Sequence, residues 1–61
     1  MNIIRVSLSL PEKGADKYAY INLNNVCSIH RLSQSTRIVF IGGWVLLVDD
    51  TPEEIGAKMV L

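Results

Sequence analysis

The chain has one cysteine and one histidine, Cys27 and His30, and these residue types can form a nucleophile and base pair. Both lie in a short run with the composition of a β-strand, where residues three apart point to opposite faces. They therefore cannot meet without a bulge in the strand. We interpret Cys27 as a half-buried, small apolar side chain and His30 as a surface residue. This interpretation predicts no catalytic residue, and we do not expect an enzyme.

Two further motifs have the residue types of a functional site but a simpler structural explanation. Asp49 and Asp50 could bind a cation, but adjacent carboxylates before a helix more often serve the positive end of the helix dipole. Gly42 and Gly43 lack the downstream Lys and Ser or Thr of a phosphate-binding loop, which favours a turn. A single cysteine and a single histidine also leave no ligand set for a structural zinc ion. We therefore predict no metal and no cofactor.

A set of arginines and tyrosines could bind an anionic ligand such as a nucleotide if the fold brought them together. Arginine forms paired hydrogen bonds with phosphate, and tyrosine stacks on bases. In an oligomer, two copies of such a set would meet at a symmetry axis. The alternative is that the arginines are solvated and the tyrosines cover apolar edges. The residues are Arg5, Arg31, Arg37, Tyr18 and Tyr20.

The most informative apolar residues surround the only tryptophan. Val39, Ile41, Trp44 and Leu46 are predicted to share one face of a hairpin. Tryptophan is enriched at interface hot spots, and contiguous exposed apolar area marks binding sites. The ordinary alternative is a protein core. If this face is a homodimer interface, both explanations hold, because the residues then form a binding site and are also buried.

The hairpin that would carry these residues is the strongest structural signal in the chain. Two β-branched and aromatic runs, 36–41 and 44–49, flank two glycines that can take the positive φ of a two-residue turn. That turn pairs Val39 with Leu46 and Ile38 with Leu47, and cross-strand partners share a face. Both faces are then apolar. We expect the same chain to cover one face and a second copy to cover the other.

Three more strands and a loop are predicted before this hairpin. Residues 2–10 alternate, with the inward positions at Ile4, Val6, Leu8 and Leu10, as in a half-buried strand. Residues 11–17 contain Pro, Gly and four charges and indicate an exposed loop. Strands at 18–23 and 27–32 are expected to be joined by an Asn24-Asn25 turn, with Ala19, Ile21, Leu23 and Ile29 facing the core.

A helix is predicted after the hairpin, from residue 52 to about residue 61. Thr51 and Glu54 have the spacing of a capping box, with Pro52 at the first helical position. Ile55 and Met59 then lie on one stripe at four-residue spacing. The helix is short, so we expect packing against the sheet to hold it.

Length and composition allow only one small domain, residues 1–61. With one cysteine there is no internal disulfide, and 49% hydrophobic residues favour an additional buried surface through self-association. Six basic and six acidic residues give zero formal charge, so on electrostatic grounds we expect no nucleic-acid partner. The chain shows neither a signal peptide nor an apolar run long enough to span a bilayer. We therefore expect a cytoplasmic protein with no membrane association.

A resemblance covers about two thirds of the chain. It rests on the run from Ile21 to Val26, on Ile29, on residues 36–40, on the Gly42-Gly43 turn, on Val48 and on Pro52 to Ile55. This order of apolar runs, turn and helix start resembles the small FlbD-type flagellar accessory proteins, and the first half of the LytTR DNA-binding domain is similar. The resemblance implies a sheet of four or five strands followed by a helix, in a bacterial or phage setting. Val39, Ile41, Trp44 and Leu46 stand where those families place polar residues.

The fold class we predict is α+β, an antiparallel β-meander of about five strands with one short C-terminal helix. The first hypothesis for the function is a non-enzymatic, oligomeric binding protein, a phage- or bacterium-encoded inhibitor or regulator that occupies a partner macromolecule, with a protein as the expected partner. One alternative is a flagellar accessory or regulatory protein. Another is a protein that sequesters a nucleotide between subunits.

Overall fold

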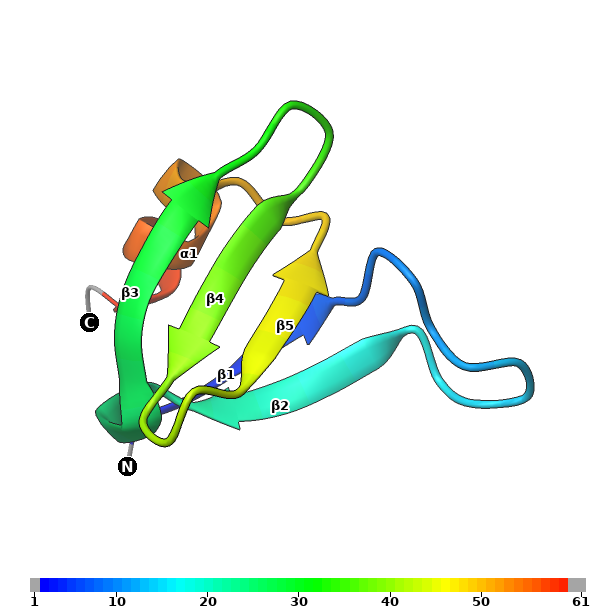
Figure 1. The fold of residues 1–61 in the computed structure, drawn as a ribbon, viewed down its shortest axis with the longest axis horizontal. Coiled ribbons are helices and arrows are strands. Elements are labelled where there is room, and N and C mark those ends of the chain that lie inside the picture. The colour runs from blue at the N-terminus through cyan, green and yellow to red at the C-terminus, as the bar shows by residue number, and fades with distance from the viewer. Residues whose placement is uncertain (1, 60–61) are drawn as a thin grey trace.

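The computed structural model describes residues 2–59 and has five antiparallel strands followed by one helix. The elements are β1 (Ile3–Ser7), β2 (Tyr18–Asn22), a 3₁₀ turn η1 (Leu23–Asn25), β3 (Val26–Arg31), β4 (Thr36–Phe40), β5 (Val45–Val48) and α1 (Pro52–Met59). β1 pairs with β2, and β3, β4 and β5 form a second sheet in sequence order (Figure 1). The predicted α+β meander is confirmed.

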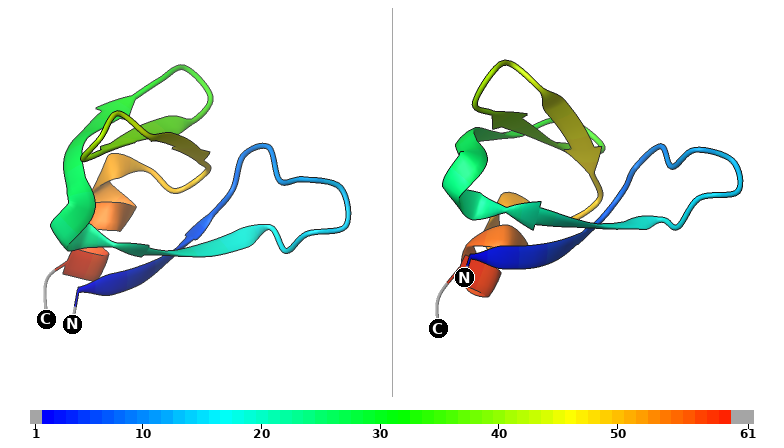
Figure 2. Two further views of the ribbon diagram at one scale, coloured as in Figure 1. Left: turned by 60° about the horizontal axis from the view of Figure 1, so that its bottom comes forward. Right: turned by 90° about the horizontal axis from the view of Figure 1, so that it is seen from below.

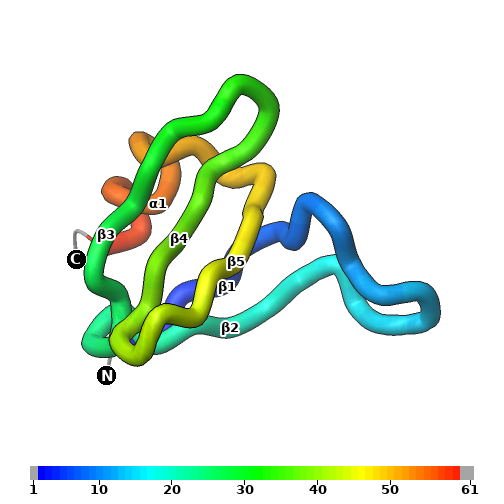
Figure 3. The backbone as a smooth tube through the Cα atoms, in the orientation of Figure 1, coloured from blue at the N-terminus to red at the C-terminus, as the bar shows by residue number. Residues whose placement is uncertain are grey.

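The two sheets are joined at one corner, where the end of β1 meets the end of β5. Leu8 forms a bridge with Val48, flanked by hydrogen bonds from Asp49 N to Ser7 O (2.8 Å) and from Ser9 N to Leu47 O (3.1 Å). The 3₁₀ turn η1, between β2 and β3, connects the first sheet with the second (Figure 3). The helix α1 contacts both β1 and β3 and fills the space between the sheets (Figure 2).

The core lies between the two sheets and the helix. Six aliphatic side chains are buried there: Ile4, Val6, Ile21, Ile38, Val48 and Ile55. Burying one side chain of this size stabilises the fold by about 1.5–3 kcal/mol. Ile29, Ala19 and Leu23 pack against this core and are only partly buried. The inward positions predicted for Ile4, Val6 and Ile21 are therefore confirmed.

The register of the β4–β5 hairpin differs from the predicted register by one residue. Ile38 lies opposite Leu46, and Val39 lies opposite Val45. A one-residue shift moves every side chain of one strand to the other face. Ile38 and Leu46 therefore face the core, while Val39 and Val45 face outward. The prediction that Val39 and Leu46 share a face is wrong.

The cause of the shift is the turn, which has three residues instead of two. Gly43 N donates to Phe40 O (3.0 Å), and Phe40 N donates to Trp44 O (2.8 Å). Gly42 and Gly43 have φ values of 94° and 90°, whereas no described non-glycine residue has a positive φ. This is the pattern of a type II turn followed by a glycine bulge. Both glycines are needed for it.

The single chain covers the inner face of this sheet with its own helix and first sheet. The outer face is mixed: Arg37 and Val45 are exposed, and Val39 and Leu47 are half-buried. Both faces of the hairpin carry apolar side chains, as expected, because apolar residues occupy both faces of each strand in either register, and Val39, Val45 and Leu47 lie on the outer face. Only part of the outer face remains apolar and open.

The first strand ends earlier than predicted. β1 stops at Ser7, Leu8 is half-buried in its bridge, and Leu10 is 81% exposed. The inward position predicted for Leu10 is therefore wrong. The chain leaves the sheet at this point and forms a projecting loop (Figure 1), and residues 11–17 are all exposed as predicted.

The connection between β2 and β3 is a 3₁₀ turn instead of the predicted two-residue turn. The Asn22 side chain accepts a hydrogen bond from Asn24 N (3.0 Å), which satisfies one of the free amides at the start of the turn. β3 then carries a bulge at Cys27, because Val26 lies opposite Phe40 and Ser28 opposite Val39.

The helix begins with the predicted capping box. Glu54 N donates to Thr51 Oγ1 (3.1 Å), and Thr51 N donates to Glu54 Oε1 (2.8 Å). Ile55 is fully buried, whereas Met59, predicted on the same stripe, is 44% exposed. The last two residues of the predicted helix, 60–61, lie outside the described residues.

Candidate interaction surface

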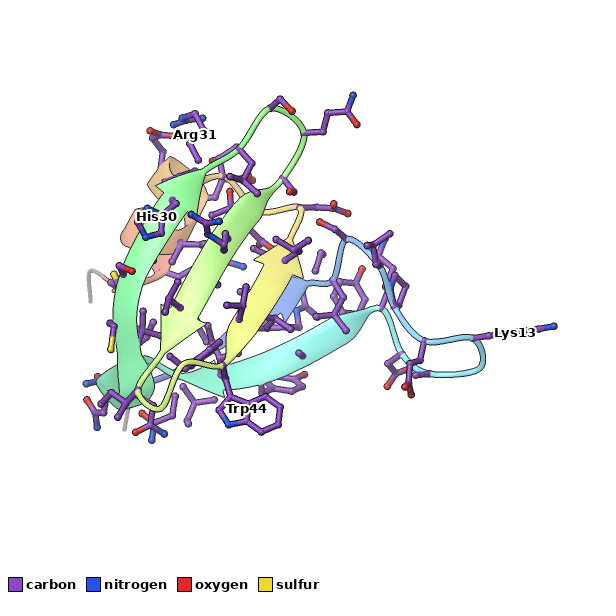
Figure 4. All side chains as sticks on the ribbon, in the orientation of Figure 1. Lys13, His30, Arg31 and Trp44 are labelled. Atoms are coloured by element: carbon purple, nitrogen blue, oxygen red, sulfur yellow. The ribbon has the colours of Figure 1, made fainter. Side chains whose placement is uncertain are left out.

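The most exposed apolar side chains of the second sheet gather at the β4–β5 turn. Ile41 is 63% exposed, Trp44 78% and Val45 52%. The Trp44 indole projects from the turn, away from the sheet (Figure 4). A Cβ atom on Gly42 would lie 3.9 Å from Trp44 Cδ1, so the indole lies close to the glycine backbone. We call Ile41, Trp44 and Val45 the hairpin-tip cluster.

This cluster contains two of the four residues that the sequence predicted for a binding face, Ile41 and Trp44. Leu46 packs against the core, and Val39 is half-buried on the outer face. Val45, which the predicted register assigned to the opposite face, joins the cluster. Both a two-residue and a three-residue turn place glycines at positive φ, so the two glycines are compatible with either. Assuming the three-residue turn would have given the observed register and placed Val45 on the outer face.

A groove of about 400 Å³ lies beside the hairpin-tip cluster, between β5 and the segment that follows β1. It is lined by Leu8, Leu10, Glu12, Ala15, Val45, Leu46 and Leu47. Val45 belongs to both the groove and the cluster, so the two form a continuous, mainly apolar surface. Sequence reasoning missed the groove because its walls come from distant parts of the chain.

A second surface lies on the outer face of the first sheet. Arg5 Cζ lies 4.7 Å from the centroid of the Tyr18 ring, and Lys17 Nζ lies 5.4 Å from the same centroid. Arg5 lies opposite Tyr20, whose side chain is 72% exposed. The single chain thus brings together three of the five residues predicted for an anion site.

The other two arginines lie elsewhere. Arg31, at the end of β3, forms hydrogen bonds and an ion pair with Glu53 in the first turn of α1. The hydrogen bond from Arg31 holds the pKa of the Glu53 carboxyl below its usual value. Arg37 lies on β4, opposite His30 and Leu47. The five residues do not converge within one chain.

Cys27 and His30 both lie on β3, and the strand has a bulge at Cys27, the exception on which their predicted separation depended. His30 is exposed, as predicted, and its Nε2 lies 2.8 Å from Ser28 Oγ (Figure 4). Cys27 sits at the β3 bulge and is exposed, so the prediction of a half-buried side chain is wrong. The bulge is the cause, because it takes Cys27 out of the regular alternation that would turn it inward.

The side chains of Asp49 and Asp50 form hydrogen bonds with residues at and after the end of β1. Asp49 Oδ1 accepts a hydrogen bond from Ser9 Oγ (2.9 Å), and Asp50 Oδ1 accepts one from Ser7 N (2.6 Å). Asp50 Oδ2 also pairs with Lys58 Nζ at 2.8 Å. The capping box supplies the side-chain hydrogen bonds at the helix N-terminus. The two carboxylates connect the β5–α1 loop with Ser7 at the end of β1 and with Ser9 beyond it.

The ionisation of Asp50 follows from these contacts. Burial alone would raise the pKa of this carboxyl, because a charge is poorly solvated there. The hydrogen bonds from Lys58 and from Ser7 N, together with the Lys58 charge, outweigh this effect. The pKa of Asp50 is lowered as a result.

Within residues 2–59, no three side chains of His, Cys, Asp or Glu lie close enough to hold a metal ion together. The same part of the chain has no helix that is both long and apolar enough to cross a membrane. Comparisons with protein-family models, with curated proteins and with solved structures found no match to the chain.

Proposed function

We propose that this chain is a small, non-enzymatic binding protein that self-associates and acts as an inhibitor or regulator by occupying a partner macromolecule. The observation that carries the self-association in this proposal is the hairpin-tip cluster, three large apolar side chains exposed around one turn. Their exposure to water is unfavourable, and burial in an interface removes it. Tryptophan, the most exposed of the three, is among the residues most enriched at binding hot spots.

Two further observations support this proposal. The cluster continues into the groove beside β5, so the apolar surface is larger than the turn itself. Contiguous patches of this kind mark interaction sites on small proteins. The chain also has equal numbers of acidic and basic residues, six of each, so copies of it do not repel one another at long range.

The test is the mass of the protein in solution, measured by light scattering on a size-exclusion column over a hundredfold concentration range. We expect assemblies larger than the 6.8 kDa chain at the upper concentrations. Trp44→Glu places a charge in the cluster and should shift the protein to monomer while leaving its circular dichroism unchanged. Tyr20→Glu is the matched control, because Tyr20 is similarly exposed but lies on the first sheet.

Two results would contradict the proposal. If the wild-type protein has the monomer mass at every concentration, self-association is excluded. If Tyr20→Glu dissociates the assembly and Trp44→Glu does not, the protein associates through the first sheet and the hairpin-tip cluster is not its binding surface.

A second candidate function is binding of an anionic, aromatic ligand such as a nucleotide, and the contact between Arg5 and Tyr18 favours it. A guanidinium group held beside two tyrosines offers a charge for phosphate and rings for a base. Thermal unfolding with a panel of nucleotides tests this function. A ligand that raises the melting temperature of wild type should not do so for Arg5→Ala, and Arg37→Ala on the other sheet should respond like wild type. No shift with any nucleotide would exclude it.

A further inference from the structure

One edge of β5 is paired along only part of its length. Phe40 N donates to Trp44 O, and backbone groups along an antiparallel strand point alternately to its two sides. Val45 and Leu47 therefore direct their N–H and C=O groups away from β4. Leu47 O accepts a hydrogen bond from Ser9 N (3.1 Å). Within the described residues, Val45 has no backbone partner on this side.

Pro11 explains why the chain does not complete this edge itself. Extending the register of the Leu8–Val48 bridge by three residues would place Pro11 opposite Val45. Proline has no N–H group and cannot donate to Val45 O. The chain leaves the edge before this position, and Leu10 is 81% exposed. The open edge of β5 thus remains beside the groove.

We propose that a second copy of this chain completes the edge, with the two β5 strands antiparallel about a twofold axis at Val45. Val45 N of each copy then donates to Val45 O of the other, as in the close pair of an antiparallel ladder. The contact is self-complementary, because one residue supplies both donor and acceptor in each copy. The inference rests on the self-association in the proposed function. It adds that the β5 edge is the contact surface and that the two β5 strands pair in antiparallel orientation.

The side chains around this edge contribute apolar area to such a dimer. A standard interface covers about 800 Å² of each partner, which is under a fifth of the 4507 Å² accessible surface of this chain. A buried tryptophan alone contributes roughly 150–250 Å². With the axis at Val45, Trp44 of one copy lies opposite Leu46 of the other, at the groove. Leu10 and Ile41, 81% and 63% exposed, lie on either side of this contact.

Ser9 limits the length of the added strand. It occupies the β5 edge at Leu47, so the second copy can pair only before that residue. With the twofold axis at Val45, Gly43 of the second copy lies opposite Leu47 of the first. The β4–β5 turn of the second copy therefore begins where Ser9 blocks the edge, and a longer strand pairing is not needed. The geometry therefore gives a closed dimer and not a growing sheet.

The first measurement is amide hydrogen exchange by NMR at several protein concentrations. An edge amide that points to solvent exchanges fast, so Val45 should become at least tenfold more protected as the dimer forms. Asp49 N is bonded to Ser7 O within one chain and serves as the internal control, with protection independent of concentration. Equal and fast exchange of Val45 in monomer and assembly would overturn the inference.

The second measurement is the mass of two variants at the same position. Val45→Pro removes only the N–H group that points away from β4. Proline is tolerated at such positions of an edge strand, because the lost N–H forms no hydrogen bond within the sheet. We expect Val45→Pro to keep its circular dichroism and to remain at 6.8 kDa, and Val45→Thr, which keeps the N–H, to reach twice that mass.

The outcomes separate this inference from the proposed function. If Val45→Pro still dimerises while Trp44→Glu is monomeric, the protein associates through the hairpin-tip cluster without strand pairing, and only the inference fails. If the wild-type protein is a monomer throughout, both fail. If Val45→Pro does not fold, the exchange of the Val45 amide in the wild-type protein still decides the question.

Discussion

Asp50 Oδ2 lies 2.8 Å from Lys58 Nζ, so the loop before α1 is tied to the last turn of the same helix. Asp50 also accepts a hydrogen bond from Ser7 N, and Lys58 donates one to Arg5 O. These contacts fasten the helix to β1. The Asp50 side chain is only 12% exposed, which limits the screening of the pair by solvent.

The first prediction concerns stability in acid. Because the pKa of Asp50 is lowered in the folded protein, the unfolded chain takes up a proton at this position first as the pH falls. The stabilisation is therefore complete above pH 3.8, the ordinary pKa of an aspartate in the unfolded chain, and is lost as the pH falls through the lower pKa of the folded protein. We expect Asp50→Asn to cost about 1–2 kcal/mol near pH 7, and the difference from wild type to shrink below pH 3.8.

Denaturant unfolding at several pH values measures this difference. Asp16→Asn is the control, because Asp16 lies in the exposed loop after β1 and its replacement should leave stability nearly unchanged. A cost for Asp50→Asn that stays constant from neutral to acidic pH would show that the carboxylate charge has no role.

The second prediction concerns the start of the helix. α1 has only eight residues, so its free N-terminal amides are a large share of its backbone groups. Thr51→Ala removes the hydroxyl that accepts from Glu54 N and should cost about 1 kcal/mol, with Thr51→Ser close to wild type. Thermal unfolding checks this, since 1 kcal/mol corresponds to roughly 4–8 °C in a domain of this size. An equal loss in both variants would point to the threonine methyl group instead.

The capping box could be predicted because all its information is local. Thr51 and Glu54 are three residues apart, and their residue types define the geometry. The alternation in β1 was equally informative for Ile4 and Val6, which are buried as predicted. Sequence patterns were sufficient wherever a few neighbouring residues determine the structure.

The hairpin register could not be predicted in the same way. Gly42 and Gly43 permit both a two-residue and a three-residue turn, and both turns need positive φ at glycine. The choice depends on which face is buried, and Ile38 and Val48 are buried against Ile55 of α1 and against Ile4, Val6 and Ile21 of the first sheet, which is distant in the sequence. The prediction that Val39 and Leu46 share a face was wrong for this reason.

The third prediction concerns the core between the sheets and the helix. Ile38 has no exposed surface, so Ile38→Ala leaves a cavity and should cost about 2–5 kcal/mol. A chain of this length has a total stability of roughly 3–9 kcal/mol at about 0.05–0.15 kcal/mol per residue. We therefore expect the variant to be largely unfolded at moderate denaturant concentrations.

The control for this core substitution is Ile3→Ala, since Ile3 is 41% exposed at the start of β1. It removes the same atoms from a site where water already has access, so its cost should be clearly smaller. Equal losses of stability, measured by urea unfolding at a concentration where both variants are monomeric, would mean that the core does not lie at Ile38.

The last prediction uses two glycines whose replacement by alanine should have opposite effects. Gly43 has a φ of 90°, and a Cβ there would meet no atom within 4 Å, so Gly43→Ala tests backbone strain alone. That strain should cost about 1–2 kcal/mol.

Gly56 lies inside α1 with ordinary helical backbone and equally open space. Gly56→Ala should stabilise the protein by about 0.5–1 kcal/mol, because alanine loses less entropy in a helix. Melting temperatures that fall for Gly43→Ala and rise for Gly56→Ala would agree with the three-residue turn and the helix bounds, and a fall in both would contradict the helix.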